Sequence, residues 1–428
     1  MPVPTMVLAG RGLRSPRRKG ESTPRQGPLA AALADLGCAA LLIVSQSADD
    51  PDLAAFLASE VHLGQSLLVA PRGAPARLAY LVAMERDEAA GTGLPLVTPA
   101  ELEVLRAAAE AAEPPAFLAW VVERALDRCG VPPGRVALAG HGPAGVVHAA
   151  CSALARAGWT WVPGNDLVLL LRKRKTAAEL AAIRHSAAAT CDALLATARL
   201  LAVAVSRDGE LWLEGERLTV GRLRTAMAGL LAARGCEQPR GNIVAPGEQG
   251  GVPHSAGTPE RVLRPGESLV VDLFPRSRMF ADCTRTFCVG RPSEPLVRAH
   301  AAVTAALAGA RKGAVAGARG WDLQEAVCGL FAARGYPTPI SHPGGTSGYV
   351  HNLGHGVGFE LHELPLFRKA AGAEGVLAAG DVFTLEPGLY DPAAGFGVRL
   401  EDLVHLGPGG LETLTPLPYA LDPREWEG

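Results

Sequence analysis

Short apolar segments alternate with helical patterns over the first part of the chain. Apolar runs of strand length recur at residues 39–44, 66–70, 78–82 and 135–139. Apolar residues at helical spacing lie between and after these runs, at 52–58, 117–129 and 144–156. This alternation predicts a smaller α/β domain, which we place at residues 28–165.

A second unit begins with an amphipathic helix. Thr176 and Glu179 have the spacing of a capping box, in which both side chains satisfy free N–H groups at a helix start. A second helix is expected over 220–234, with Gly235 as its stop. The chain then becomes rich in strands, Gly and Pro. We expect a separate domain over residues 166–428, and the candidate chemistry lies within it.

Two acidic residues accompany apolar strands in this second unit. Asp272 lies inside the run Ser268–Phe274, and Asp282 directly precedes a second strand that contains Arg285. A buried carboxylate must be paired, protonated or bound to a metal ion, because an isolated buried charge is too costly. Taken alone, the pair fits either a metal site or a capped turn with a salt bridge to Arg285.

A cluster of histidines favours the metal site over the capped turn. His351, His355 and His362 fall within twelve residues, among glycines that let the backbone approach a ligand closely. Glu386 ends another apolar run, and Glu401 lies on the same strand face as Arg399. Four carboxylates with one imidazole form an oxygen-rich set that suits two divalent metal ions, with Mn²⁺ preferred and Co²⁺ or Zn²⁺ as alternatives.

The order of these motifs resembles the pita-bread metallopeptidases, the family of aminopeptidase P, prolidase, methionine aminopeptidase and creatinase. The resemblance covers residues 175–421, and its most distinctive segments are Asp282–Phe287 and Gly397–Asp402. It implies an α+β pita-bread catalytic domain, with two similar halves around the metals, preceded by a creatinase-like α/β domain. That N-terminal domain points to the aminopeptidase P and prolidase (Xaa-Pro peptidase) branch.

The resemblance also implies a role for each matching residue. Asp272 would bind one metal ion, His355 and Glu386 the other, and Asp282 and Glu401 would bridge both. The remaining catalytic positions would be His254, His351 and His362 near the substrate, Arg399 behind the carboxylates, and Glu386 as the proton carrier. The ten-residue spacing from Asp272 to Asp282 is about one residue shorter than is typical of the family, so the hairpin turn must be tighter or bulged.

The implied function is hydrolysis of the peptide bond before proline, by an Xaa-Pro aminopeptidase or an Xaa-Pro dipeptidase. The partner would be a small peptide with proline in second position, and a homodimer is expected. Three alternatives stay open: another pita-bread hydrolase or lyase, a catalytically weak peptidase-like binding protein, and a nucleic-acid binder that uses the Arg-rich start of the chain.

Composition bears on location and partners. The net charge of −2 provides no general attraction to nucleic acid or to anionic membranes. We find no run of about 18 apolar residues that would span a membrane. The eight scattered cysteines favour free thiols and a cytoplasmic protein. Residues 1–27 are interpreted as a basic flexible leader. His141 and His148 have no acidic neighbours at ligand spacing and are interpreted as structural.

Overall fold

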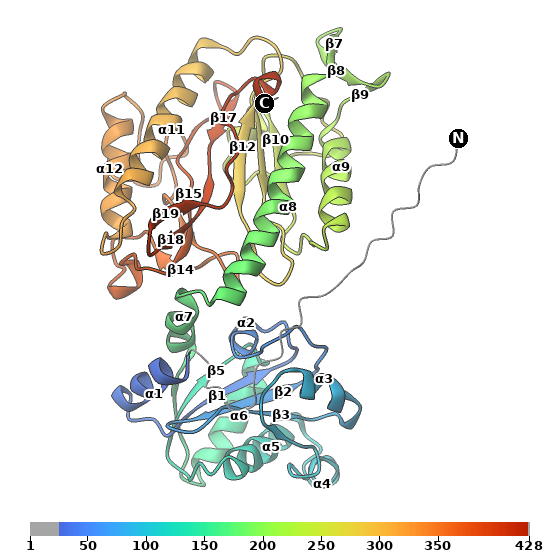
Figure 1. Cartoon of the computed structure of the whole chain (residues 1–428), viewed down its shortest axis with the longest axis vertical. Helices are drawn as coiled ribbons and strands as arrows, with labels where there is room; N and C mark the ends of the chain where they lie inside the picture. Colours follow the sequence, from blue (N-terminus) through green and yellow to red (C-terminus); the bar gives the residue numbers. More distant parts are fainter. Residues whose placement is uncertain (1–24, 427–428) are drawn as a thin grey trace. The chain divides into compact units, whose positions relative to one another are not determined.

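The computed structural model describes residues 25–426, and the chain divides into two compact units, Met1–Asn165 and Asp166–Gly428 (Figure 1). Residues 1–24 of the expected basic leader lie outside the described residues. The first helix begins at Gln26, just inside the segment assigned to that leader.

The N-terminal unit is built on a six-stranded mixed sheet in the order β4-β3-β2-β1-β5-β6. Its strands are β1 (Ala40–Ser45), β2 (Ser66–Pro71), β3 (Arg77–Tyr80), β4 (Leu96–Val97), β5 (Arg135–Ala139) and β6 (Thr160–Pro163). Its helices are α1 (Gln26–Asp35), α2 (Pro51–Ala54), α3 (Arg86–Gly91), α4 (Val104–Glu110), α5 (Pro114–Arg128) and α6 (Ala144–Ala155), with a 3-10 turn η1 (Ala83–Glu85). The predicted α/β alternation is confirmed. The helix expected over 52–58 is shorter than predicted, because the chain leaves helical geometry after Ala54 in a turn that bonds Phe56 N–H to the Leu53 carbonyl.

The second unit contains several small antiparallel sheets and long helices. Its helices are α7 (Asn165–Lys173, at the boundary), α8 (Ala177–Ala202), α9 (Val220–Ala233), α10 (Gly247–Gly250), α11 (Glu294–Gly313) and α12 (Gly320–Ala332), with 3-10 turns η2 (Ala373–Gly375) and η3 (Pro423–Trp426). The capping box at the start of α8 is confirmed, because the Thr176 hydroxyl accepts from Glu179 N–H and the Glu179 carboxylate accepts from Thr176 N–H.

Four sheets make up the strand content of this unit within the described residues. One is a three-stranded sheet of β10 (Asn242–Pro246), β11 (Leu269–Leu273) and β12 (Cys283–Phe287). A five-stranded sheet has the order β14 (Glu363–Leu366), β13 (His355–Gly356), β15 (Val382–Leu385), β18 (Asp402–Gly407) and β19 (Gly410–Thr413). The two smaller sheets are β16 (Gly388–Asp391) with β17 (Phe396–Arg399), and the outlying β7 (Val205–Arg207), β8 (Glu210–Leu213) and β9 (Glu216–Arg217).

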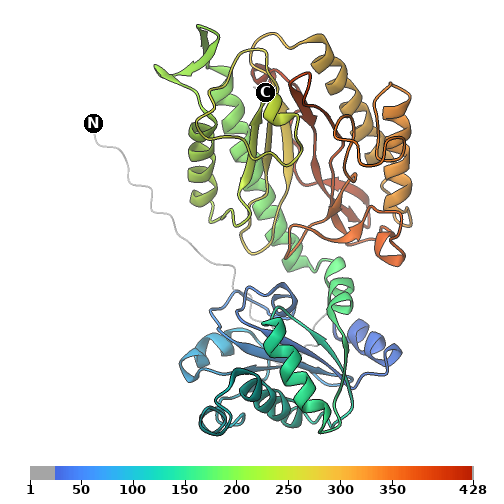
Figure 2. The ribbon, with the colours of Figure 1, turned by 180° about the vertical axis from the view of Figure 1, so that it is seen from behind.

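Two halves can be distinguished within this unit. Helices α8 and α9 lie beside β10 and β12, whereas α11 and α12 lie beside the five-stranded sheet, in both ribbon views (Figures 1 and 2). Each half has its own apolar core: one joins α8 and α9 to β10, β11 and β12, and the other joins α11 and α12 to β15, β16, β17 and β18. The two α+β halves expected from the sequence are therefore present.

The halves are joined along β12. Thr284 accepts a backbone bond from Glu401 N–H at 3.0 Å, and the Thr286 hydroxyl donates to the Arg399 carbonyl at 2.9 Å. Arg285 is fully buried and donates to Asp402 Oδ1 at 2.8 Å and to the Glu401 carbonyl at 2.5 Å. Arg285 thus pairs with Asp402 across the seam, and not with either aspartate of its own hairpin.

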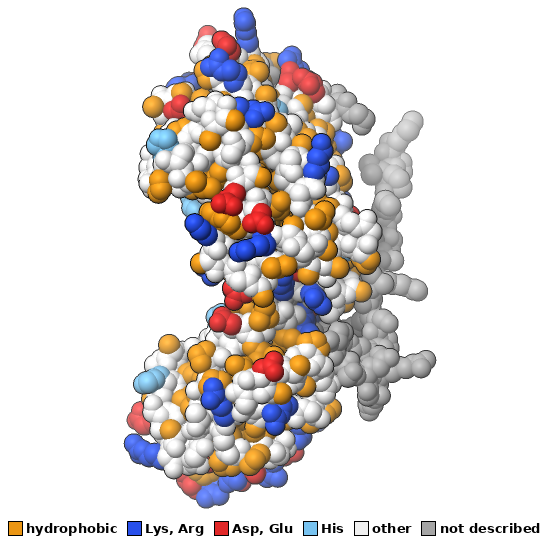
Figure 3. Space-filling view, turned by 90° about the vertical axis from the view of Figure 1, so that its left-hand side faces the viewer, with side chains coloured by type: hydrophobic (Ala, Val, Ile, Leu, Met, Phe, Trp, Pro, Cys, Tyr) orange, Lys and Arg blue, Asp and Glu red, His pale blue; other side chains and the backbone are white. Residues whose placement is uncertain are grey.

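No helix within residues 25–426 is long and apolar enough to cross a membrane. On the face shown in Figure 3, basic and acidic side chains are interspersed. That face offers no basic field to support the nucleic-acid alternative.

Replacing Arg285 by Met should lower the free energy of unfolding by about 3 kcal/mol, because it removes one partner of a buried ion pair and leaves carbonyl groups without a donor. Urea unfolding followed by circular dichroism measures this loss. Arg298→Ala is the matched control, since Arg298 pairs with Glu294 on the exposed surface of α11 and should cost no more than about 0.5 kcal/mol. Equal losses in the two variants would contradict a stabilising role for the seam.

Candidate metal centre

Separate strands bring the five expected metal ligands to one place. Asp272 lies in β11 and faces Thr284 across the β11–β12 ladder, while Asp282 directly precedes β12. His355 lies in β13, Glu386 follows β15, and Glu401 lies between β17 and β18. Because Glu401 N–H bonds to the Thr284 carbonyl, both halves of the unit meet at Thr284.

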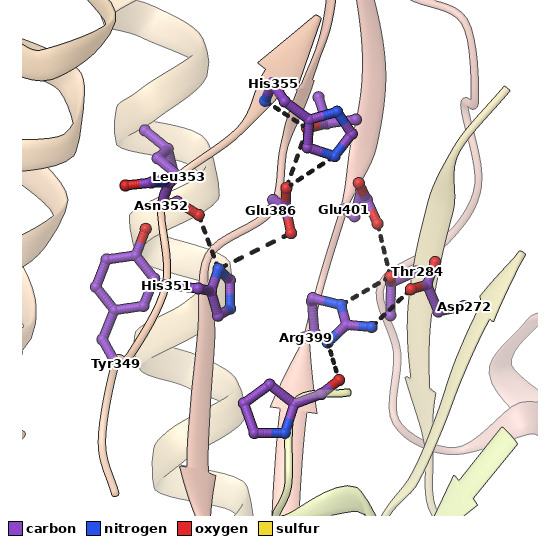
Figure 4. A network of polar contacts seen from close by, with 12 residues as sticks. Asp272, Thr284, Tyr349, His351, Asn352, Leu353, His355, Glu386, Arg399 and Glu401 are labelled. Atoms are coloured by element: carbon purple, nitrogen blue, oxygen red, sulfur yellow. Dashed lines mark hydrogen bonds and ion pairs between the residues drawn. The ribbon is translucent and has the colours of Figure 1, made fainter. Parts of the chain in front are cut away.

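The side-chain atoms of these residues are close to one another. Ligand atoms of Asp282, His355 and Glu401 all lie within 4.8 Å of one another. His355 Nε2 is 3.3 Å from Glu386 Oε1 and 3.7 Å from Asp282 Oδ2. Figure 4 shows His355, Glu386 and Glu401 around a common space, with Arg399 and Asp272 beside them.

Three carboxylate oxygens in this cluster are buried without a hydrogen-bond donor among residues 25–426: Asp272 Oδ1, Asp282 Oδ1 and Glu401 Oε1. The second carboxylate oxygen of Asp272 and that of Glu401 do have donors. Asp272 Oδ2 accepts from Arg399 at 2.7 Å, and Glu401 Oε2 accepts from the Thr284 hydroxyl at 2.6 Å. A buried anionic oxygen without a partner is strongly unfavourable. The residues therefore fit divalent cations, which would satisfy these oxygens.

The tautomer of His355 agrees with this interpretation. Its Nδ1 lies 3.2 Å from the Gly356 carbonyl, so Nδ1 carries the proton and Nε2 presents a lone pair. Burial, and the nearby charge of His362, lower the pKa of His355 to about 3 and keep the ring neutral. A neutral Nε2 beside the oxygens of Glu386 and Asp282 cannot donate to them, but it can share a cation with them.

The carboxylates oppose one another's ionisation. Burial raises the pKa of Asp282 well above its usual range, and Glu401, Asp272 and Glu386 add to the effect. The pKa of Glu401 is raised in the same way, by burial first and by the charge of Glu386 second. Burial raises the pKa of Glu386 to about 7, although Arg399 acts in the opposite direction. A group of anions held this closely takes up either protons or metal cations.

Arg399 connects the carboxylates to an aromatic residue that we did not predict from the sequence. Its Nη2 donates to Asp272 Oδ2, its Nε donates to the Thr284 hydroxyl at 3.0 Å, and its Nη1 donates to the Tyr390 hydroxyl at 2.9 Å. Tyr390 in turn lies 2.9 Å from His351 Nε2, while His351 Nδ1 faces the Asn352 carbonyl at 2.7 Å. Both ring nitrogens of His351 are therefore engaged within the protein.

His254 and His362 differ from His351. Both are exposed, and neither ring has a hydrogen-bond partner among the described residues. The His362 ring packs edge-on against His355, with ring centroids 4.2 Å apart. Arg399 Nη1 donates to the Pro253 carbonyl at 3.3 Å, and Pro253 directly precedes His254. This bond therefore holds the backbone next to His254 in place. These two imidazoles are free to meet a substrate.

The hairpin between Asp272 and Asp282 closes tightly, as its short length requires. Arg276 and Phe280 form an isolated antiparallel bridge near its tip, and Ala281 N–H bonds to the Pro275 carbonyl at 3.0 Å. Phe280 N–H also donates to the Gly358 carbonyl at 2.8 Å, which links the hairpin to the histidine segment. The shortened turn still leaves both aspartates facing the cluster.

One expectation for the N-terminal unit is wrong. His141 does have acidic neighbours, because Asp50 Oδ1 lies 2.9 Å from its Nδ1 and Asp52 is close enough to complete a cluster. The sequence gives no sign of this pairing, since the residues are far apart along the chain. Backbone N–H groups of Asp52, His141 and Gly140 and the Asn165 amide bind these carboxylates. The cluster is therefore satisfied internally, whereas His148 is exposed on α6.

Comparisons with known proteins agree with this architecture. Residues 181–408 match the Metallopeptidase family M24. The Xaa-Pro dipeptidase of Pyrococcus furiosus is 33% identical over 206 residues, which cover 47% of this chain and 56% of that protein. The match thus spans about half the length of that relative.

Solved structures extend the likeness to the whole fold. The prolidase of Pyrococcus horikoshii OT3 has a TM-score of 0.71 at 21% identity, covering 93% of this chain and 100% of that one. The X-Pro aminopeptidase of Thermotoga maritima has a TM-score of 0.68 at 22% identity, covering 93% and 99%. They confirm the expected pita-bread fold with its additional N-terminal domain. With the family match covering more than half of its residues, this chain belongs to the Metallopeptidase family M24.

Proposed function

We propose that this protein hydrolyses the peptide bond before proline in short peptides, as an Xaa-Pro dipeptidase or aminopeptidase with a dinuclear metal centre. The observation that carries the proposal is the cluster of Asp282, His355 and Glu401, whose ligand atoms lie within 4.8 Å of one another, next to buried carboxylate oxygens that have no donor among residues 25–426. The names of the similar proteins point to the same substrate class. The proposed ligands are Asp272, Asp282, His355, Glu386 and Glu401.

The charges of the cluster favour two divalent ions over one. Four carboxylates and the Arg399 guanidinium leave three negative charges in a buried space. One divalent ion would leave one uncompensated negative charge, whereas two convert the site to a single positive charge. A slightly positive site suits both an anionic nucleophile and the developing oxyanion of a peptide carbonyl.

Each residue then has a distinct task in hydrolysis. Bound cations supply Lewis acidity and make a water molecule acidic near neutral pH. The Glu386 carboxylate accepts a proton from the attacking water and delivers it to the leaving nitrogen. Protonation matters here because the prolyl nitrogen carries no hydrogen of its own in the peptide. His254 and His362 donate to the peptide carbonyl oxygen as it gains charge.

Other features remain predictions. Oxygen ligands dominate the set, which favours Mn²⁺ with Co²⁺ or Zn²⁺ as alternatives. All eight cysteines lie within the described residues and none forms a disulfide, which favours a reducing compartment such as the cytoplasm. A homodimer is predicted only from the resemblance. The main rival, a catalytically weak binding protein of the same fold, would keep metal binding without turnover.

Loading the chelated protein with Mn²⁺ should raise its free energy of unfolding, by about 2.7 kcal/mol at a concentration 100 times the dissociation constant. Thermal unfolding with and without chelator measures the gain, and elemental analysis should find about two ions per chain. Asp282→Asn is the matched control. It removes one of the repelling carboxylates, so it should not destabilise the metal-free protein but should lose most of the gain. An undiminished gain in this variant would exclude Asp282 as a ligand.

Replacing Glu386 by Gln should lower kcat by at least about 100-fold, because the amide cannot carry the proton. Dipeptide turnover and metal content must be measured on the same samples, since Glu386 is also a proposed ligand. A variant with full metal occupancy and the unchanged kcat would refute the role of Glu386 as the proton carrier.

Substrate choice tests the proline requirement. Ala-Ala should be cleaved at least about ten-fold more slowly than Ala-Pro under identical Mn²⁺ loading, which corresponds to about 1.4 kcal/mol in transition-state binding. Comparing kcat/KM for Ala-Pro and Ala-Pro-Ala separates a dipeptidase from an aminopeptidase. Equal rates for Ala-Pro and Ala-Ala would show that proline is not selected.

A further inference from the structure

A buried group of charges lies directly beside His362 and has no part in the site described so far. Glu363, the next residue, is one of the most buried acids of the chain, with a side chain 1% exposed. Its carboxylate binds Arg172 Nη2 at 2.9 Å and Lys175 Nζ at 2.5 Å, and both basic side chains are also 1% exposed. Three fully buried charges at one point are costly unless each is paired.

The Arg172 guanidinium also binds an acidic residue that precedes His362. Arg172 Nη2 lies 2.5 Å from Glu360 Oε2, two residues before the histidine. Glu360 N–H is 3.4 Å from Glu363 Oε2, and Gly358 N–H donates to the Glu360 carbonyl at 3.0 Å. The Arg172 guanidinium therefore holds the segment on both sides of His362, through Glu360 before it and Glu363 after it.

Glu363 also belongs to the strand next to the metal centre. In the β13–β14 ladder it pairs with Gly356, the neighbour of His355. Gly358 has no room for a side chain, because a Cβ there would lie 2.2 Å from Glu363 Oε1. Burial opposes the charged form of Glu363, but Lys175 and Arg172 outweigh it and lower its pKa, so the carboxylate stays ionised.

We propose that Arg172, Lys175 and Glu363 are positioning residues, which fix the exposed imidazole of His362 against His355 and toward the substrate. Arg172 lies at the end of α7 and Lys175 directly precedes the cap of α8, so rigid helix ends hold the histidine segment. The contribution to catalysis rests on the proposed peptidase function, whereas the fixing of the segment does not.

Hydrogen–deuterium exchange of residues 357–366 tests the fixing without any assay of activity. Glu363→Gln and the milder Arg172→Lys should each raise exchange in this segment by at least about five-fold. Lys173→Met is the matched control, because Lys173 is a buried lysine of the same segment whose ion pair is with Asp381, 3.4 Å away, and not with Glu363. Exchange in 357–366 should stay unchanged in this control.

Steady-state kinetics on Ala-Pro gives the second readout. At equal metal content and folded fraction, Glu363→Gln and Arg172→Lys should lose at least ten-fold in kcat, with Lys173→Met within two-fold of the parent protein. Lys175→Arg, which keeps the charge, should retain more activity than Lys175→Met.

The proposal is overturned if exchange in 357–366 is unchanged in Glu363→Gln and Arg172→Lys, or if Lys173→Met loses as much kcat as they do. Should the parent protein cleave no Xaa-Pro peptide, the proposed function fails and the exchange result alone decides the positioning.

Discussion

Repulsion between four clustered carboxylates, three of them buried, is the constraint on which the site in the C-terminal unit depends. Asp272, Asp282 and Glu401 are each less than a tenth exposed, and they face one another across the seam between two sheets. Their charges can be held together only by a strong counter-charge or by protonation. Arg399 provides one positive charge, and the Thr284 hydroxyl provides one neutral donor. The three oxygens that have no donor among residues 25–426 indicate where cations would complete the balance.

Backbone pairing, and not the cations, sets the positions of these carboxylates. Glu401 is fixed opposite Thr284 by its own N–H, and Asp272 is fixed opposite the same residue by the β11–β12 register. The fully buried pair of Arg285 and Asp402 joins the same two segments one residue further along each segment. The contacts that join the two halves therefore also bring the proposed ligands together. The proposed ligands are thereby preorganised for metal ions, which saves part of the ordering cost of binding.

Local signals in the sequence were sufficient for several strands of both units, the capped helix and the five ligand candidates. An acid inside an apolar strand and histidines among glycines are unusual enough to stand out without any tertiary information. The hydroxyl partners were missed, because Thr284 and Tyr390 resemble ordinary strand residues until the fold brings them to Arg399. The contact of His141 with Asp50 was missed for the same reason, since the two positions are 91 residues apart. The small outlying sheet of β7, β8 and β9 was missed because its strands have only two to four residues.

Hydrogen bonding separates histidines that look alike in the sequence. His355 donates through Nδ1 to a carbonyl and leaves Nε2 for a cation. His351 uses both nitrogens inside the protein and lies 3.9 Å from Glu386 Oε2, so any effect on catalysis would pass through protein neighbours such as Tyr390 and Glu386. Among the four histidines of the candidate site, His254 and His362 have no ring hydrogen bond to any described residue. A direct contact with substrate is therefore expected of these two, and the one beside the metal centre, His362, is also the one whose segment is held by buried charges. An imidazole that must meet a developing charge gains most from such rigidity, because any freedom it kept would have to be lost in the transition state.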